Sequence, residues 1–541
     1  MITEFSLFDL MRLMGNPDVS KGEIQDLFAM YGCPPDPPEG DTLRIEVFPN
    51  RPDMLMVEGA ARALKGILGI EKGLRVFSPA PAVNFVKIDP AVKTVRPHSS
   101  FAIVRNIVLD EQTVASIMQI QEKLHQTHGR KRRKVAIGIH DLDKIRFPIT
   151  YSAVEPDKVS FVPLEGEFAL TCRQILERHP KGKEYAHLLE GARLYPLIFD
   201  SEGTVLSMPP IINGNATRVT PNTRNLLIDV TGTDEDAVEK ACTIIASGLS
   251  ERGATIELVH TGDKVTPTLS PSKMKFSAGY CRRLLGEDLS NSEIVEALLR
   301  MRFLAEEIDS ETIEVTVPAY RTDILHQFDL VEDTAIGHGY GNFEPSIPSL
   351  PTIGREHPAI MKSNKAKDAL IGLGYQEAYT FAMTSPGKLF SKMNEPEREI
   401  AAVSNPKTED FTILRDELMP SLIAILEINK HNTYPQKIFE AGDVVVLDSE
   451  ADVNCLTERR IAAVFSGGTF EAMKGHFVYL LRQLGIDNPE FVPSERSTFL
   501  PGRQAYVVSG GREIGIIGEL HPQALLNHGI DTPTVGFETT F

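Results

Sequence analysis

The 541-residue sequence contains no tryptophan, and its five cysteines are scattered without a CxxC pair. An odd, dispersed set of thiols excludes a zinc ribbon and is typical of a reducing compartment. No stretch approaches the roughly 18 apolar residues that a membrane helix needs. The N-terminus, MITEFSLFDLMRLMG, lacks the basic start of a secretory signal. We therefore expect a cytoplasmic protein that does not enter a membrane.

Several common catalytic motifs are also missing. The sequence has no GxxxxGK[ST], no HExxH and no GxSxG, so phosphate-loop, zinc-protease and serine-hydrolase functions lose their sequence support. No period of 20 to 50 residues is present, which argues against a solenoid or a propeller. The glycine cluster GHGYG at 337–341 does not follow the GxGxxG pattern, and we interpret it as a helix stop.

Positive charge is in deficit, with 56 Lys and Arg against 74 Asp and Glu, a net charge of −18. Phosphate binding depends on Lys and Arg, so this balance argues against a protein that holds nucleic acid with its whole surface. Basic residues do concentrate in one run, RKRRK at Arg130–Lys134. Such a run is most often a solvated loop, and the alternative is a local RNA contact.

The length predicts three or four domains, and the composition is that of a folded α+β multidomain protein. The proline-rich loop CPPDPPEG separates a helical start from the strand LRIEVF, and Asp53 is expected to cap a helix over 54–68. We expect an N-terminal module (1–82), an α+β domain (83–264), a mainly helical domain (265–345), and a C-terminal antiparallel sheet with flanking helices (346–541).

Polar residues follow one face of a predicted strand in the second domain. The runs YPLIF and TVLSM, joined by Asp200–Gly203, predict a hairpin. In LLIDVT, alternation directs Asp229 and Thr231 away from the core, where they could accept a hydrogen bond from a phenolic hydroxyl or position a water. Ser207 could join them. The alternative is a sheet edge that faces solvent.

Four carboxylates gather near a predicted helix in the third domain: Asp323, Asp329, Glu332 and Asp333. Spacings of three and four residues place Asp329 beside the later two. Acidic groups on one face repel unless a cation compensates, and Mg²⁺ prefers such oxygen ligands. The alternative is an exposed acidic face with Asp323 as a cap. The opposite, buried stripe is expected to contain Ile324, Phe328, Val331 and Ala335.

Long segments of the chain together resemble a known family. They include EVFPNRPDMLMVEGAARAL, VAIGIHDLDKI, YPLIFDSEGTVLSMPPIINGNATRVTPNTRNLLIDVTGTD, VPAYRTDILHQFDLVEDTAIGHGYGN and SNPKTEDFTILRDELMPSLI. From about Glu46 to Glu538 the sequence is similar to the beta subunits of phenylalanyl-tRNA synthetase. It lacks the additional modules of the longer bacterial form, so it resembles the archaeal and eukaryotic type.

The resemblance implies roles for particular residues. The second domain would be an editing domain that hydrolyses tyrosine wrongly attached to the phenylalanine tRNA, because a synthesis pocket rejects an added hydroxyl only weakly. Its implied pocket residues are Leu197, Ser207, Asn213, Asp229 and Thr231, with Asn215 as a further candidate. The third domain would be winged-helix-like and would bind Mg²⁺ through Asp323, Asp329, Glu332 and Asp333.

The C-terminal domain resembles a class II synthetase catalytic fold that is inactive. Arg415 is present in LRDEL, but no glycine-rich motif ending in arginine follows. The resemblance implies an alpha subunit that binds ATP, activates phenylalanine and forms an α2β2 heterotetramer with this chain and its tRNA. Two alternatives remain: a scaffold subunit with a decayed editing site, and a metal hydrolase at the Asp323 cluster, which lacks a histidine ligand set.

Overall fold

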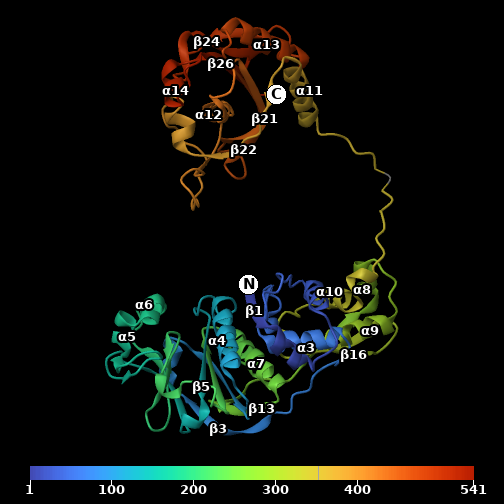
Figure 1. The fold of residues 1–541 in the computed structure, drawn as a ribbon, viewed down its shortest axis with the longest axis vertical. Helices are drawn as coiled ribbons and strands as arrows, with labels where there is room; N and C mark the ends of the chain where they lie inside the picture. Colours follow the sequence, from blue (N-terminus) through green and yellow to red (C-terminus); the bar gives the residue numbers. More distant parts are fainter. Residues whose placement is uncertain (351, 541) are drawn as a thin grey trace. The chain divides into compact units, whose positions relative to one another are not determined.

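The computed structural model describes residues 1–350 and 352–540. The chain folds as two compact units, 1–347 and 348–541, which are described separately here (Figure 1). The α+β multidomain architecture is thus confirmed, whereas the finer division into four parts stays a prediction. Within the described ranges, no helix combines the length and apolar character that crossing a membrane requires.

The N-terminal part pairs a small antiparallel sheet with three helices. Its elements are β1 (Ile2–Ser6), β2 (Thr42–Glu46), α1 (Leu7–Met14), α2 (Lys21–Met30) and α3 (Val57–Ile67). The expected cap at Asp53 is wrong. Pro52 starts a separate 3-10 turn, α3 begins only at Val57, and the buried Asp53 carboxylate accepts two hydrogen bonds of 2.9 Å from Arg51.

A ten-stranded mixed sheet forms the centre of the first unit. Its order is β11 (Ile212–Asn213), β10 (Val205–Met208), β9 (Tyr195–Phe199), β6 (Ile149–Val154), β3 (Ala80–Ile88), β13 (Thr255–Thr261), β4 (His98–Arg105), β12 (Leu226–Gly232) and β5 (Val135–Asp141), with β14 (Lys264–Thr266) beside β13. A separate pair is formed by β7 (Ser160–Phe161) and β8 (Leu170–Thr171).

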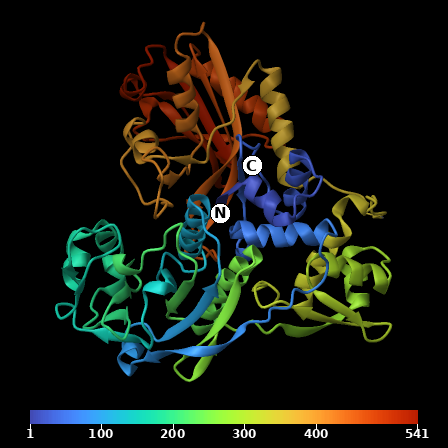
Figure 2. The same ribbon diagram turned by 60° about the horizontal axis from the view of Figure 1, so that its bottom comes forward.

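Helices cover this sheet at defined places. Along α4 (Glu111–Gln126) and α7 (Glu235–Leu249), apolar residues at helical spacing pack on the face of β12 that carries Leu226, Ile228 and Val230. The short helices α5 (Cys172–Arg178) and α6 (Pro180–Tyr185) lie at the β9 to β11 end, as Figures 1 and 2 show. Helices therefore cover this face of the sheet, while Asp229 lies on the opposite face of β12.

The predicted hairpin is confirmed. Strands β9 and β10 pair antiparallel, and Asp200 organises the turn because its carboxylate accepts hydrogen bonds from the backbone of Glu202 and Thr204. The alternative interpretation of LLIDVT as a sheet edge that faces solvent is wrong. Strand β12 lies between β4 and β5, and every residue of it is buried.

The last part of the first unit combines a three-stranded antiparallel sheet with three helices. Its elements are β15 (Ser272–Ser277), α8 (Ala278–Leu285), α9 (Asn291–Arg300), β16 (Leu304–Glu307), β17 (Thr312–Val317) and α10 (Gln327–His338), with strand order β15-β17-β16. The expected buried stripe of α10 is wrong at Phe328, which is exposed, but is confirmed at Val331 and Ala335, which are buried together with Leu330.

The second unit is a seven-stranded sheet between two layers of helices. Its order is β18 (Gln376–Glu377), β21 (Gln436–Leu447), β22 (Cys455–Ser466), β26 (Thr534–Thr540), β25 (Arg512–Leu520), β24 (Phe499–Ser509) and β23 (Glu490–Pro493). All neighbours are antiparallel except β18 and β21. A further two-stranded pair is β19 (Met383–Thr384) and β20 (Ile413–Leu414).

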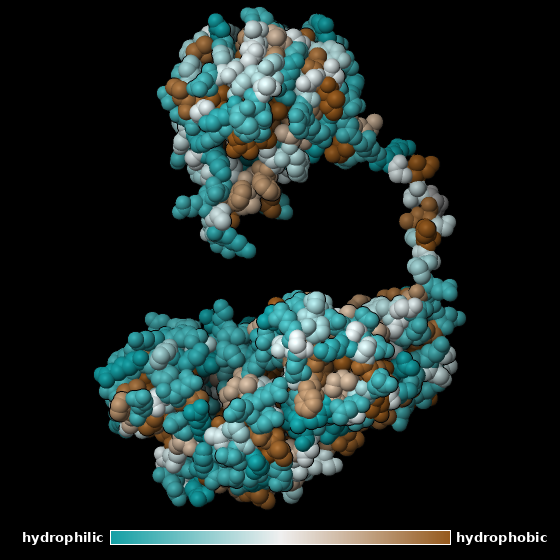
Figure 3. Space-filling model, viewed as in Figure 1, coloured by the Kyte–Doolittle hydropathy of each residue, from teal (hydrophilic) through white to brown (hydrophobic). Residues whose placement is uncertain are grey.

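Alternation along the strands of this second sheet supplies two cores. Helices α11 (Pro358–Gly372) and α13 (Phe470–Gln483) cover the face that carries Ile461 and Ala463. Helices α12 (Met419–Asn429) and α14 (Pro522–Asn527) cover the face that carries Ala462 and Val464. The segment that joins the two units exposes apolar side chains, seen as brown patches in Figure 3; they include Ile347, Leu350 and Ile353.

Candidate functional site

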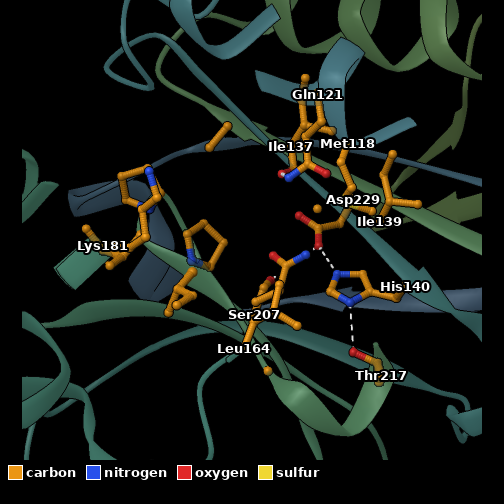
Figure 4. Close-up of a pocket in the computed structure, with 18 of the residues that line it drawn as sticks. Met118, Gln121, Ile137, Ile139, His140, Leu164, Lys181, Ser207, Thr217 and Asp229 are labelled. Carbon is orange, nitrogen blue, oxygen red and sulfur yellow. Dashed lines mark hydrogen bonds and ion pairs between the residues drawn. The ribbon is translucent and has the colours of Figure 1, made fainter. Parts of the chain in front are cut away.

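A cavity of about 280 Å³ lies beside the edge strand β5 of the ten-stranded sheet (Figure 4). The two ends of the sheet meet here, because the Ser207 hydroxyl on β10 donates to Asp229 on β12 at 3.3 Å. Apolar walls come from Met118 on α4 and from Ile137 and Ile139 on β5. The cavity therefore combines an apolar surface with a polar end, as small-molecule sites commonly do.

The polar end is a chain of three buried side chains. His140 Nε2 lies 2.6 Å from Asp229 Oδ2, and His140 Nδ1 lies 2.8 Å from the Thr217 hydroxyl (Figure 4). The carboxylate accepts, so Nε2 carries the proton that it donates to Asp229, and Nδ1 of the neutral ring then accepts from the Thr217 hydroxyl. Within the described part of the chain, Asp229 Oδ1 accepts from no protein donor. This oxygen is free to accept a hydrogen bond from a ligand.

A glycine makes the histidine–carboxylate pair possible. Gly138 lies opposite Asp229 in the β5–β12 register, on the same face of the sheet. A Cβ atom at this position would lie 2.2 Å from Asp229 Oδ2 and 2.8 Å from His140 Nε2. Any larger residue would therefore collide with both partners. The sequence IGIH places this glycine two residues before the histidine, so both share one face.

The structure brings together three of the five predicted pocket residues. Asp229, Ser207 and Asn213 all line the cavity. Leu197 does not, because its side chain is buried with the apolar residues of β9, β10 and α5. Thr231 does not line it either: its hydroxyl accepts a hydrogen bond of 3.0 Å from Arg96 and is wholly buried. Asn215 is likewise outside the wall.

Sequence reasoning missed the residues that β5 and its neighbours contribute, namely His140, Gly138 and Thr217. The segment VAIGIHD was noted only as part of the family pattern. Its alternation could have placed His140 and Gly138 on one face. Their pairing with β12, however, joins positions about ninety residues apart in sequence, and that register is visible only in the structure.

A second histidine supports the cavity wall. His125 on α4 accepts a hydrogen bond from the Ile137 backbone N–H at 2.8 Å through Nε2. Burial lowers the pKa of His125 to about 4, since the charged form would lose its hydration. The ring is therefore neutral near pH 7. Its neighbour Glu122 has a lowered pKa, first because it accepts a hydrogen bond from His125.

Arg132 lies at the rim of the same cavity. It donates to the Ile211 carbonyl at 2.8 Å and to Glu122 at 3.0 Å, and its guanidinium lies 4.3 Å from the centre of the Tyr185 ring. These contacts tie the loop before β5 to the turn after β10 and to α6. Arg132 thus fixes the cavity mouth from three sides.

The four carboxylates predicted for Mg²⁺ are not gathered into one centre. Asp323 and Asp333 both pair with the buried Arg321, and Asp329 accepts hydrogen bonds of 2.8 Å from the backbone of Leu325 and His326 at the start of α10. The described residues contain no group of three or more His, Cys, Asp or Glu side chains placed to hold a metal. Because Arg321 pairs with two of the carboxylates and a third caps the helix, this arrangement does not fit a resident metal.

In the second unit, Arg415 is committed to the protein itself. It is buried and donates to Glu440 at 2.8 Å, to the Thr380 hydroxyl at 2.5 Å and to the Asp443 carbonyl at 3.1 Å. Three of the five guanidinium N–H donors are thus engaged inside the protein, and the charge is paired with the buried Glu440 carboxylate, so Arg415 is not presented to a nucleotide phosphate. Its role is structural.

Three family models cover most of the chain. They are the B3/4 domain (residues 95–263), the tRNA synthetase B5 domain (274–340) and the phenylalanyl tRNA synthetase beta chain CLM domain (344–541). The editing-type cavity lies inside the first of these ranges. This domain set defines the class: a subunit of an aminoacyl-tRNA synthetase.

Curated relatives narrow the class further. The chain is 41% identical over 539 residues to the phenylalanine--tRNA ligase beta subunit of Archaeoglobus fulgidus, covering 98% of this chain and 96% of that protein. It is 40% identical over 542 residues to the one from Pyrococcus furiosus, covering 98% and 97%. The chain belongs to the family of phenylalanine--tRNA ligase beta subunits, which confirms the resemblance found in the sequence.

A solved structure resembles the first unit. The N-terminal fragment of the phenylalanyl-tRNA synthetase beta subunit from Pyrococcus horikoshii is 40% identical and has a TM-score of 0.60. The match covers 63% of this chain and 100% of the fragment. The class II likeness of the second unit stays a prediction.

Proposed function

We propose that this chain serves as the beta subunit of a phenylalanine--tRNA ligase and hydrolyses tyrosyl-tRNA made in error. The observation that carries the proposal is the buried Asp229–His140 pair at the end of an apolar-walled cavity. Alpha subunits would supply ATP binding and phenylalanine activation in an α2β2 heterotetramer with tRNA, in the cytoplasm.

Selection of tyrosine follows from the free oxygen of Asp229. The aromatic ring would lie against the apolar side chains that line the cavity, with its phenolic hydroxyl donating to Oδ1. Phenylalanine offers no such donor and would leave a desolvated carboxylate oxygen unsatisfied. Sites built to bond a substrate hydroxyl reject the analogue that lacks it by about 10⁴- to 10⁵-fold. Correctly charged tRNA would therefore escape hydrolysis.

His140 holds the recognising carboxylate in place. Its Nε2–H donates a hydrogen bond to Oδ2. The carboxylate therefore cannot rotate freely, and Oδ1 is presented to the cavity. Thr217 in turn fixes the ring. Ester hydrolysis needs a water beside the aminoacyl carbonyl, and the Asn213 side chain at the cavity wall is a candidate to orient it. Leu197 and Thr231, which lie behind the wall, would act through packing and not through contact.

The domain assignments also belong to the proposal. The division at 1–82, 83–264, 265–345 and 346–541 would separate the N-terminal, editing, winged-helix-like and inactive class II-like parts. The family resemblance implies Mg²⁺ binding through Asp323, Asp329, Glu332 and Asp333, but the pairing of Asp323 and Asp333 with Arg321 does not fit a metal, so Mg²⁺ is left out of the proposal.

The test is deacylation of tyrosyl-tRNA by this chain assembled with its alpha subunit. We expect Asp229→Ala to lower the rate about 100-fold or more. Asp263→Ala, an exposed aspartate outside the cavity wall, is the matched control and should match the parent. Both variants should still support phenylalanyl-tRNA synthesis.

A second candidate function is an assembly scaffold whose editing site has decayed. Arg415 is buried and pairs with Glu440 of the same chain, which is compatible with a purely structural role for the second unit. Equal tyrosyl-tRNA deacylation by the parent and Asp229→Ala would favour this scaffold over the editing proposal.

A further inference from the structure

The loop that enters β5 has an unusual backbone. Three consecutive residues, Arg130, Lys131 and Arg132, have φ angles of 47°, 55° and 65°. Left-handed backbone costs an L-residue about 1–2 kcal/mol, and it persists only where surrounding contacts enforce it. Runs of such residues gather at functional sites, so this loop calls for a functional explanation.

Hydrogen bonds enforce this conformation. The Arg132 backbone N–H donates to the His125 carbonyl at 3.1 Å, and the Lys134 N–H donates to the Gly129 carbonyl at 2.8 Å. The Arg132 side chain then extends to the cavity rim, where it bonds Ile211 and Glu122. The loop is therefore anchored to the end of α4 and to the cavity at the same time.

The same geometry leaves the flanking cations on the surface. Arg130, Lys131 and Arg133 are exposed. Within residues 1–350 and 352–540, none of the three side chains forms an ion pair, whereas Arg132 pairs with Glu122 and Lys134 pairs with Asp234. What sets these three apart is their position: they are consecutive or nearly so on one loop, beside the residue that bonds the cavity rim. These three are available to an anion.

The cavity mouth adds further positive charge. Arg218, Lys181 and Arg132 line the cavity with Glu165; Lys181 pairs with Glu184 and Arg132 with Glu122, whereas Arg218 forms no ion pair among the described residues. A ligand whose reacting end enters the cavity would thus carry the rest of its body past a row of cations. Cations along this path favour a ligand with a chain of phosphates that leads to a terminal ester. The aminoacylated single-stranded end of a nucleic acid has this form.

We propose that Arg130, Lys131 and Arg133, termed here the basic loop, bind the backbone phosphates of the single-stranded 3′ end of the aminoacylated tRNA. The contact positions the terminal ester at the cavity. The inference rests on the proposed editing function and deepens it by assigning the surface that holds the tRNA end. The left-handed backbone keeps the three cations facing outward while Arg132 holds the rim.

The test uses the chain assembled with its alpha subunit and the triple variant Arg130→Gln, Lys131→Gln, Arg133→Gln. Glutamine keeps the side-chain length and removes the charge. The matched control replaces three exposed lysines that form no ion pair among the described residues and do not line the cavity: Lys87, Lys93 and Lys275. Substrates are tyrosyl-tRNA and the small ester tyrosyl-adenosine, which has no phosphate chain.

Three phosphate contacts to a single strand should make kcat/KM for tyrosyl-tRNA fall about 20-fold more between 50 and 200 mM salt in the parent than in the triple variant. The control variant should keep the parental salt dependence, and all three proteins should cleave tyrosyl-adenosine equally. A triple variant with the parental rate and salt dependence on tyrosyl-tRNA overturns the inference.

Direct binding separates this inference from the proposed function. A single-stranded RNA oligonucleotide ending in CCA is titrated onto the parent, the triple variant and the control. If the parent hydrolyses no tyrosyl-tRNA, the editing proposal fails, yet weaker oligonucleotide binding by the triple variant alone still supports the loop assignment. Unchanged oligonucleotide binding with weaker association of the alpha subunit would overturn it in favour of a protein contact.

Discussion

Replacement of Gly138 by alanine is the most selective perturbation that the structure offers for the candidate site. The added Cβ would lie 2.2 Å from Asp229 Oδ2, where ordinary contact begins at 3.4 Å. The carboxylate must therefore retreat by about 1.2 Å. The 2.6 Å bond between His140 and Asp229 cannot survive such a movement.

The expected magnitude follows from the lost bond. A hydrogen bond to a charged group is worth about 1.5–3 kcal/mol, which corresponds to about 10- to 150-fold in rate. We expect Gly138→Ala to reduce kcat/KM for tyrosyl-tRNA deacylation by this factor. Synthesis of phenylalanyl-tRNA by the assembled enzyme should be unchanged, because that reaction is assigned to the alpha subunit.

The control is Gly341→Ala, since a Cβ at Gly341 would meet no atom within 4 Å. This variant should edit like the parent. The reasoning is refuted if Gly138→Ala also edits at the parental rate while its thermal unfolding is unchanged, because the methyl group would then fit beside the carboxylate. A loss of phenylalanyl-tRNA synthesis would instead indicate general unfolding.

Two further predictions concern buried ionisable groups. The pKa of His125 lies near 4 in the folded chain, below its ordinary 6.5, so only the unfolded chain gains a proton as the pH falls from 6.5 to 4. The free energy of unfolding should drop by about 3 kcal/mol over that window, and His125→Gln should remove this component in urea titrations at pH 7 and pH 4.5. Arg415→Met should lower the unfolding free energy of the second unit by about 3–5 kcal/mol, because it leaves the buried Glu440 without its cation. Denaturation that matches the parent would contradict the structural role of Arg415.

Local signals in the sequence predicted local structure well. The hairpin at β9 and β10 was predicted because Asp200 and Gly203 are turn residues between two apolar runs. The core face of β12 was predicted because alternation assigns Leu226, Ile228 and Val230 to one side. Each of these predictions depends on residues within about a dozen positions of one another.

Long-range relations could not be predicted in the same way. Alternation gave Asp229 and Thr231 the same face. It could not show that Arg96, more than a hundred residues earlier, would donate a hydrogen bond to the Thr231 hydroxyl. Nor could it show that the sheet brings Ser207 to Asp229 across its two ends. In the acidic cluster, spacing predicted repulsion among carboxylates, but it could not show that Arg321 would lie between Asp323 and Asp333 and pair with both.

In the proposed editing reaction, the arrangement around Asp229 would let a buried carboxylate discriminate between two amino acids that differ by one oxygen. A carboxylate without partners would be too costly to bury, and one with all its acceptor sites filled would not respond to a hydroxyl. His140 and Ser207 satisfy Oδ2, which makes burial tolerable, and Oδ1 is left to the ligand. The tyrosine hydroxyl would supply the hydrogen bond that Oδ1 lacks, and phenylalanine would leave Oδ1 without a donor. In that reaction selectivity would depend on His140 as much as on Asp229, since the histidine determines which oxygen remains free.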